Sequence, residues 1–386
     1  MLKGWIRVSL LDDVKYYRKV LHQIPELGFD LPKTHEFIKK VLLSLGYRLE
    51  IVAKTGIIAY REGRQPQYLA FRADMDALPI EEASDYPHPS RHKGQMHACG
   101  HDGHMALLLG FAKSLCQYPA LNKGVLLIFQ PAEETTGGAK PMIDEGIFQL
   151  FNVEAIFGYH LYPELEEGTI GLASGPLMAM ATELDVEFIG KSGHGGKPHQ
   201  AIDALLMACH FVQSVQAILT RTLDPMEPKV ITFGKIQGGE ARSSIMKNVK
   251  LEGTIRTFSE RLTDDILHRL HRMAKGLEMV FNGTIDIQAH KRYPPVINDD
   301  DLFQTVDRLL ESNEKEYLKP MMLAEDFAYY QQVVPGLFMM LGTRNEEKGY
   351  IHPLHSSHFN FREEALLKGI ELYLKICRSF HVMPLD

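Results

Sequence analysis

The sequence predicts an α/β protein with a mostly parallel central sheet and an inserted α+β domain. The stretches 68–73, 125–130 and 155–159 are nearly all apolar, as expected of parallel strands buried on both faces. Residues 180–290 instead follow the order β-α-β-β-α-β, which is that of a ferredoxin-like split βαβ sandwich. At 386 residues the chain is also longer than one hydrophobic core usually serves, so two domains are expected.

The composition is that of an ordinary soluble globular protein rather than of a nucleic-acid or membrane protein. Apolar residues make up 45% and charged residues 24%, and a net charge of −7 gives no reason to expect a nucleic-acid partner. No apolar run approaches the roughly 18 residues that a membrane span needs. No signal-peptide core is complete before the Asp pair at 12–13. The cysteines lack paired spacing, which suits a reducing cytoplasm; they are Cys99, Cys116, Cys209 and Cys377.

Two helices are predicted at the N-terminal end. Residues 12–23 carry an amphipathic pattern that stops before Pro25. A second helix is predicted to start at the cap residue Thr34 and to end at Gly46.

The strand at 68–73 delivers two carboxylates, Asp74 and Asp76, at its C-terminal end. In open α/β sheets this edge is where ligands bind. The pair could belong to a solvated turn, or it could support a metal site, and Pro79 would fix the turn in either case.

The stretch 96–104 concentrates three histidines, a cysteine and an aspartate in nine positions. It could be a polar loop before the helix predicted at about 103–117. Thiolate and imidazole side chains are, however, typical ligands of first-row divalent cations. The spacing of Cys99 and His101, around the flexible Gly100, favours the metal interpretation.

Two further strands finish on side chains that can bind metal. The strand at 125–130 is followed by Glu133 and Glu134, a charged pair that needs partners so close to a buried strand. Consecutive residues of extended backbone point in opposite directions, so one carboxylate can face a metal and the other a substrate. The strand at 155–159 is followed by His160.

The inserted domain begins where the pattern changes near residue 180 and is predicted to end at 290. The catalytic domain then comprises residues 1–179 and 291–386. Within the insertion, His194 lies on a glycine-rich turn, which is either a plain loop or a mobile carrier of a functional histidine. The elements predicted there are strands at 182–189, 229–236, 248–258 and 284–289 and helices at 201–219 and 264–281.

The last part of the chain returns to the pattern of the first domain. A helix is predicted to start within 324–328, whose two carboxylates the helix dipole would favour. A buried strand at 337–342 is followed by three histidines within 352–358, and a terminal helix is predicted at 362–379.

The candidate ligands are too many for one tetrahedral ion with an open position. They suit two divalent ions that share a bridging ligand and activate a water. Glu133, beside a ligand but not itself one, would be the general base, and the reaction would be hydrolysis of an acyl bond, most simply an amide. The ligands counted are Cys99, His101, Glu134, His160 and one of the C-terminal histidines.

Several motifs resemble the aminoacylase-type metallopeptidases, an amidohydrolase family that includes hippurate hydrolase, auxin-conjugate (IAA-amino acid) hydrolases and N-acetyldiaminopimelate deacetylase. With the early LHQIPELGF and the late AEDFAYY and PLHSSHFNF, the resemblance covers nearly the whole chain. The motifs that carry it are FRADMDALPI, HACGHDGH, QPAEE, GYH, SGHGGKPH and EGTIRT.

The resemblance implies a doubly wound catalytic domain interrupted by a lid domain, with a homodimer formed through the lids. It implies Glu133 as general base, with Asp74 or Asp76 as the supporting carboxylate, and His194 as the donor to the oxyanion. Arg256 would hold the substrate α-carboxylate, although an isolated Arg is more often a salt-bridge partner. The implied metal ligands are Cys99, His101, Glu134, His160 and His355.

One departure from the family concerns the lid. Many relatives carry Asn-Val-Ile-Pro thirteen residues before the arginine, and here Ser243 stands where that Asn would fall. Serine can still donate a hydrogen bond to a substrate, but over a shorter reach.

The sequence as a whole predicts a cytoplasmic N-acyl-L-amino acid amidohydrolase with two ions of Mn²⁺, Zn²⁺, Co²⁺ or Ni²⁺ per chain. N-acetyldiaminopimelate and hippurate-like substrates are candidates. A dipeptidase or carboxypeptidase on the same two-metal site is the alternative. A non-catalytic metal-binding module and a thiol hydrolase that uses Cys99 are the rivals from other classes.

Overall fold

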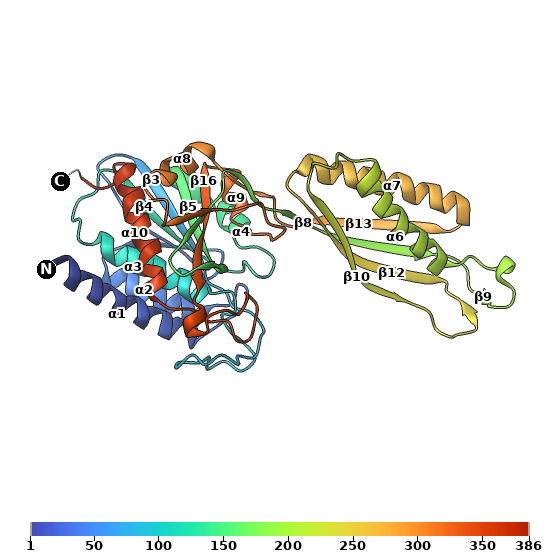
Figure 1. Cartoon of the computed structure of the whole chain (residues 1–386), viewed down its shortest axis with the longest axis horizontal. Coiled ribbons are helices and arrows are strands. Elements are labelled where there is room, and N and C mark those ends of the chain that lie inside the picture. The colour runs from blue at the N-terminus through green and yellow to red at the C-terminus, as the bar shows by residue number, and fades with distance from the viewer. Residues whose placement is uncertain (1, 385–386) are drawn as a thin grey trace. The chain divides into compact units, whose positions relative to one another are not determined.

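The computed structural model describes residues 2–384, with side chains from residue 9 onward, and divides into two compact units. The first comprises the chain up to Leu177, Ile297–Lys319 and the part from Asp326 onward (Figure 1). The second comprises Met178–Val296 and, in addition, the short segment Pro320–Glu325. This segment, which the sequence analysis left with the first domain, is held in the second unit because the Ala179 N–H donates to the carbonyls of Met321 and Leu323.

The first unit is built on one mixed sheet, eight-stranded over the described residues. Its central strands β4, β3, β5 and β16 run parallel, whereas β1 and β2 are antiparallel at one edge. In spatial order the strands are β1 (Arg48–Val52), β2 (Gly56–Arg61), β4 (Gly124–Gln130), β3 (Gln67–Asp74), β5 (Asn152–Glu166), β16 (Gly336–Arg344), β6 (Ile170–Leu172) and β15 (Lys315–Tyr317).

Helices cover both faces of this sheet, which confirms the doubly wound α/β class. On one face Phe71 of β3 packs on Phe111 and Tyr373 from two of the helices. On the other face Phe338 of β16 packs on Phe327. The first face carries α1 (Leu2–His22), α2 (Pro32–Ser44), α3 (His101–Leu115) and α10 (Glu364–Ser379), and the second carries α4 (Ala139–Asp144) and α9 (Ala328–Gln331) (Figure 1). The short helix α5 (Ile147–Leu150) contacts α4 and β5.

Two details of the N-terminal helices differ from the sequence prediction. Helix α1 starts at Leu2, ten residues before the amphipathic stretch from which it was predicted. The predicted cap at Thr34 is wrong, because α2 already begins at Pro32. The Glu26 carboxylate accepts hydrogen bonds from the N–H groups of Lys33 and Thr34 instead, and so caps the first turn from outside the helix.

His160 lies within a strand and not at its end. Pairing between β3 and β5 stops at Arg72 and Gly158, but β5 continues beside β16 as far as Glu166. Because β3 ends first, the edge of β5 at His160 is not paired with β3 and faces the residues that follow β3.

The second unit has the ferredoxin-like pattern expected of the insertion. Its four-stranded sheet has the order β10-β12-β8-β13, with all neighbours antiparallel. The two helices pack on one face, over a core that includes Val186, Phe188 and Phe211. The elements are β8 (Met180–Ile189), α6 (Ala204–Arg221), β10 (Lys229–Gly238), β12 (Asn248–Thr257), α7 (Glu260–Phe281) and β13 (Thr284–Lys291).

Across the described part of the chain, the structure contains no helix with the length and apolarity that crossing a membrane requires.

Candidate metal centre

Asp74, the last residue of β3, and Asp76, two residues later, have different roles. Asp74 is fully buried and uses both carboxylate oxygens, one 2.5 Å from His104 Nδ1 and the other accepting from Arg72 Nη1 at 2.7 Å. The carboxylate of Asp76 accepts the backbone N–H groups of Glu133 and Glu134, at 2.9 and 3.1 Å. Asp76 thus fixes the turn that carries the glutamate pair, whereas Asp74 is enclosed by His104 and Arg72.

Cys99, His101 and His160 form a buried cluster. Cys99 Sγ lies 3.3 Å from His160 Nε2, and the ligand atoms of the three residues all lie within 4.8 Å of one another. Gly100 between the first two adopts φ +84°, a left-handed conformation that residues with a Cβ rarely take. A side chain there would also meet Leu161 at 3.0 Å, so the turn that aims both ligands depends on glycine.

Backbone carbonyls set the tautomers of both histidines. His101 Nδ1 lies 2.8 Å from the carbonyl oxygen of Asp76, and His160 Nδ1 lies 2.7 Å from that of Leu161. A carbonyl only accepts, so each Nδ1 carries a proton and each neutral ring presents the lone pair of Nε2. His160 Nε2 faces Cys99 Sγ, and His101 belongs to the same cluster, in keeping with the way in which backbone carbonyls orient metal-binding histidines.

A second group of ligand atoms uses the same thiol. Cys99, Glu134 and His355 also have ligand atoms within 4.8 Å of one another, and His355 Nε2 lies 3.2 Å from Glu134 Oε1. His355 takes φ +64°, and its N–H donates to the carbonyl of Ala98, which ties its segment to that of Cys99. The other two C-terminal histidines, His352 and His358, are exposed and belong to neither group.

These residues fit two divalent cations that share the Cys99 sulfur. His101 Nε2 is completely buried and has no hydrogen-bond partner among the described residues. Such an atom is costly to bury unless it ligates something. Once deprotonated, one thiolate, three neutral imidazoles and one carboxylate are the donor set expected of a first-row divalent metal.

The electrostatics of the cluster also favour a cation. Burial lowers the pKa of His160 to about 3 and raises the pKa of the Cys99 thiol well above its usual range. Burial would lower the pKa of His101 as well, but Asp74 and the neighbouring carboxylates outweigh it and raise that pKa to about 10. Without a cation the site therefore holds a proton on His101 and another on Cys99.

Metal uptake by the metal-free protein should consequently depend on pH. Ligation requires deprotonated His101 and Cys99, whose pKa values both lie above neutrality, so the apparent affinity should rise from pH 6 to pH 9. Calorimetric titration with Zn²⁺ in buffers of different ionisation enthalpy would measure the protons released. An affinity independent of pH over this range would contradict the assignment of these two ligands.

Glu133 lies next to the proposed ligands but is not a member of either group that contains Cys99. It is buried, and its carboxylate lies in a cluster with a ring nitrogen of His101 and with Glu134. Burial would raise the pKa of Glu134, but His355 and His101 outweigh it and lower that pKa to about 2. Adjacent carboxylates are thus placed so that one lies among the candidate ligands and the other beside them.

A buried network that the sequence analysis missed supports this edge of the sheet. Arg72 reaches Asp326 Oδ1 at 2.9 Å and Gln130 at 3.0 Å, and Asp326 also accepts from the N–H of Ala139. The helix dipole proposed to explain Asp326 is therefore not its main partner, since α9 begins only at Ala328. An arginine inside an otherwise apolar strand was the signal that a buried acid had to be near.

The second unit holds the other predicted site residues, and two of them lie together. Strand β9 (Gly193–His194) pairs with β11 (Ser244–Ile245), and the Gly195 N–H donates to the Ser243 carbonyl. The Gly196 N–H donates to His194 Nδ1 at 3.0 Å, so that Nδ1 is an acceptor and Nε2 carries the proton. His194 is exposed and therefore presents an N–H donor to its surroundings.

Arg256, on β12, is half-buried and has no side-chain hydrogen bond or ion pair among the residues that the structure describes. Burial lowers its pKa. A structural salt bridge therefore does not explain this arginine, since no acidic partner lies within reach among the described residues of its unit.

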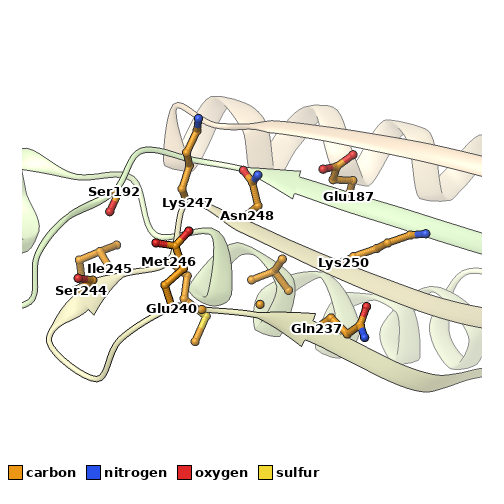
Figure 2. A pocket seen from close by; sticks show the side chains of 13 residues that line it. Glu187, Ser192, Gln237, Glu240, Ser244, Ile245, Met246, Lys247, Asn248 and Lys250 are labelled. Carbon is orange, nitrogen blue, oxygen red and sulfur yellow. The ribbon is translucent and has the colours of Figure 1, made fainter.

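A hollow of about 510 Å³ lies next to the β9–β11 pair (Figure 2). It is lined by exposed polar side chains such as Ser192, Ser244 and Asn248, with Lys247 and Lys250 at its rim, and neither His194 nor Arg256 lines it.

Comparisons with known proteins agree with this geometry. Residues 70–379 match the description of Peptidase family M20/M25/M40. The chain is 36% identical over 369 residues to the N-acetyldiaminopimelate deacetylase of Oceanobacillus iheyensis, a match that covers 94% of this chain and 98% of that protein. An uncharacterized hydrolase of Staphylococcus epidermidis is 36% identical over 377 residues, with 96% and 98% covered.

A solved structure shares the fold over nearly the whole chain. The Bacillus subtilis YXEP protein, described as a dinuclear metal-binding peptidase of the M20 family, has a TM-score of 0.82 and 31% identity. The match covers 96% of this chain and 99% of that one.

Proposed function

The chain belongs to peptidase family M20/M25/M40. We propose that it hydrolyses the amide bond of N-acyl-L-amino acids to a carboxylate and a free amino acid. It is a hydrolase of a family with dinuclear metal-binding members. The observation that carries the proposal is the Glu133–Glu134 pair. Glu134 belongs to the ligand group of Cys99 and His355, whereas the neighbouring Glu133 lies close to His101 but in neither group that contains Cys99.

The proposed ligands are Cys99, His101 and His160 for one ion, and Cys99, Glu134 and His355 for the other. When bound, two divalent ions supply Lewis-acid chemistry, which acidifies water and polarises the scissile carbonyl. Cys99 is the shared ligand. The Asp76 carboxylate keeps the glutamate turn in place by accepting two backbone hydrogen bonds. The Asp74 carboxylate holds the side chain of His104 through its Nδ1.

The proposed mechanism uses four side chains, two for the chemical steps and two for substrate binding. Glu133 removes a proton from the attacking water and then delivers it to the nitrogen of the leaving amine. His194, whose Nε2 carries a proton, donates to the oxyanion that develops on the carbonyl oxygen. Arg256, which lacks a partner in its own unit, binds the α-carboxylate of the substrate, and Ser243 lies beside the His194 loop as a further contact.

Among substrates we place N-acetyl amino acids first, with N-acetyldiaminopimelate the leading candidate because the similar Oceanobacillus protein carries that name. A turnover screen of N-acetyl, N-benzoyl and dipeptide substrates tests this, with Mn²⁺, Zn²⁺, Co²⁺ and Ni²⁺ each added to the metal-free enzyme. Faster turnover of dipeptides than of every N-acyl amino acid would favour the dipeptidase alternative. No turnover of any of them would contradict the proposal.

The rivals from other classes fit the site less well. A thiol hydrolase needs a ready thiolate, but burial raises the pKa of Cys99 well above its usual range. A non-catalytic metal-binding module has no use for a second buried carboxylate beside the ligands, and Glu133 is present and buried. Inhibition by a chelator, but not by a thiol alkylator acting on the metal-loaded enzyme, would separate these classes.

Cys99→Ala should lose at least one of the two ions and most of the activity. The reason is that both proposed ligand groups include this sulfur. Elemental analysis measures the stoichiometry, and Cys116→Ala, which removes an exposed thiol of the same unit, is the matched control. Two ions per chain in the Cys99→Ala protein would show that the thiolate is not a ligand.

We further propose a homodimer that forms through the second unit. Strand β10 is at one edge of its sheet and exposes Val230 and Ile236. Toward the other edge, α7, which packs against β13, exposes Met279 and Val280. Exposed apolar side chains beside a free strand edge favour association. Sedimentation of the full chain tests this, and a monomer at micromolar concentration would contradict it.

We place the protein in the cytoplasm, since a reduced Cys99 is required.

A further inference from the structure

A buried arginine on the first helix lies behind the metal centre. Arg18 of α1 is 1% exposed, and its guanidinium lies between the rings of Tyr86 and Phe361, at 4.4 and 3.6 Å from their centroids. A buried cation of this kind is tolerated only where acceptors and aromatic faces replace its water.

The acceptors of Arg18 come from two segments that both carry metal ligands. Its Nε donates to Asp102 Oδ2 at 3.1 Å, and Asp102 directly follows His101. Its Nη atoms donate to three groups in the segment that follows His355, namely the Phe361 carbonyl at 2.7 Å, Glu363 at 2.8 Å and Asn360 at 2.7 Å.

The two segments are otherwise joined near the metal ligands by little polar contact. One backbone hydrogen bond runs from the His355 N–H to the Ala98 carbonyl. The ligand atoms of Cys99 and His355 also lie within 4.8 Å of each other. In addition, Phe359 and Phe361 pack against the glycines at 100 and 103, where a Cβ would meet their rings at 3.3 and 2.5 Å. Arg18 therefore supplies the main charged link between them.

Removal of the Arg18 side chain would cost the two segments different numbers of hydrogen bonds. Asp102 keeps a second donor, because His22 Nδ1 lies 2.8 Å from the same Oδ2 atom, and His101 keeps the Asp76 carbonyl. The segment after His355 would lose three hydrogen bonds at once, while His355 itself holds a left-handed φ of +64° that its surroundings must stabilise.

We infer that Arg18 is a positioning residue for His355 and thereby sets the affinity of the ion that Cys99, Glu134 and His355 bind. This inference rests on the two-ion assignment proposed above. Residues that orient ligands without touching the metal commonly change metal affinity by about 10- to 100-fold. Arg18 reaches the ligand through the backbone of residues 355–361, and its effect should fall on one ion and not on both.

Calorimetric titration of the metal-free full chain with Zn²⁺ tests the inference. The unmodified protein should bind in two steps, and His355→Ala identifies the step that depends on His355. Arg18→Lys, which keeps the charge but cannot donate along four directions, should weaken that same step by about 10- to 100-fold and leave the other nearly unchanged.

The matched control is Arg61→Lys. Arg61, at the end of β2, donates to the carbonyls of Leu115 and Tyr118, at and just beyond the end of α3, at 2.7 Å each. Among the described residues it has no hydrogen bond or ion pair with a proposed ligand. Both arginine variants should lower the melting temperature, whereas only Arg18→Lys should separate the two metal affinities. If Arg18→Lys does not fold, Asn360→Ala removes one acceptor and should weaken the same step by about 3- to 10-fold.

Equal weakening of both steps, or an unchanged His355 step, would overturn the positioning role and leave the two-ion assignment intact. The same change in Arg61→Lys would overturn it as well. Failure of the unmodified protein to bind two ions would instead refute the assignment on which the inference rests.

Discussion

Glu133→Gln should retain both metal ions and lose turnover by about two to four orders of magnitude, the range usual for a general base. Glutamine has nearly the volume of glutamate and can still form hydrogen bonds, but it cannot accept the proton of the attacking water. The Asp76 carboxylate binds the backbone N–H of residue 133 and not its side chain, so the turn should survive the change. Steady-state kinetics on the preferred N-acyl substrate, with metal content measured in the same preparation, would show the effect.

The matched control is Glu164→Gln, which removes an exposed carboxylate from β5, the strand that carries His160. This variant should keep normal kcat. A near-normal kcat for Glu133→Gln at full metal content would contradict the role of Glu133 as the base. If the variant lost metal as well, Glu133 would be a ligand, and the division of labour between the two glutamates would be wrong.

Much of the first unit could be predicted because its information is local. The strands at 68–73 and 125–130 can be predicted from their nearly continuous apolar runs. Carboxylates end or follow each of them, at the edge where parallel strands present ligands. The spacing of Cys99 and His101 needs only a glycine turn. These features depend on a few neighbouring residues, and the structure places them side by side.

The features that could not be predicted depend on residues distant in the chain. Nothing near Thr34 shows that Glu26 caps the helix from outside it. The sequence also could not separate Asp74 from Asp76. The role of Asp74 follows from its contacts with His104 and Arg72, and that of Asp76 from its hydrogen bond with the backbone of Glu133. These contacts form only when the chain folds. Arg18 belongs to the same class, because its acceptors lie far away in sequence.

The continuation of β5 past His160 had a similar cause. A run of apolar residues ends at Tyr159, and this suggested a strand end. The β16 strand, contributed by the last fifth of the chain, extends the pairing to Tyr162 and beyond. Strand ends are set by the partner strand as much as by the strand's own sequence.

His194→Ala should lower kcat by about two to three orders of magnitude while changing KM little, as expected for the loss of one oxyanion donor. The donor acts on charge that develops only in the transition state, so ground-state binding should be nearly unaffected. The Gly196 N–H already occupies Nδ1, which leaves Nε2–H as the donor that the substitution removes. Folding and metal content should survive, because His194 is exposed and packs against little.

His199→Ala, which removes an exposed histidine of the following turn, is the matched control and should keep normal kcat. His194 belongs to the second unit and the proposed ligands to the first, so its contribution requires closure within one chain or a partner chain. Mixing inactive His194→Ala with inactive Glu133→Gln separates these routes. Partial activity in the mixture would show that His194 acts across a dimer, and its absence would leave closure within the chain. A normal kcat for His194→Ala would reduce the glycine-rich turn to a plain loop.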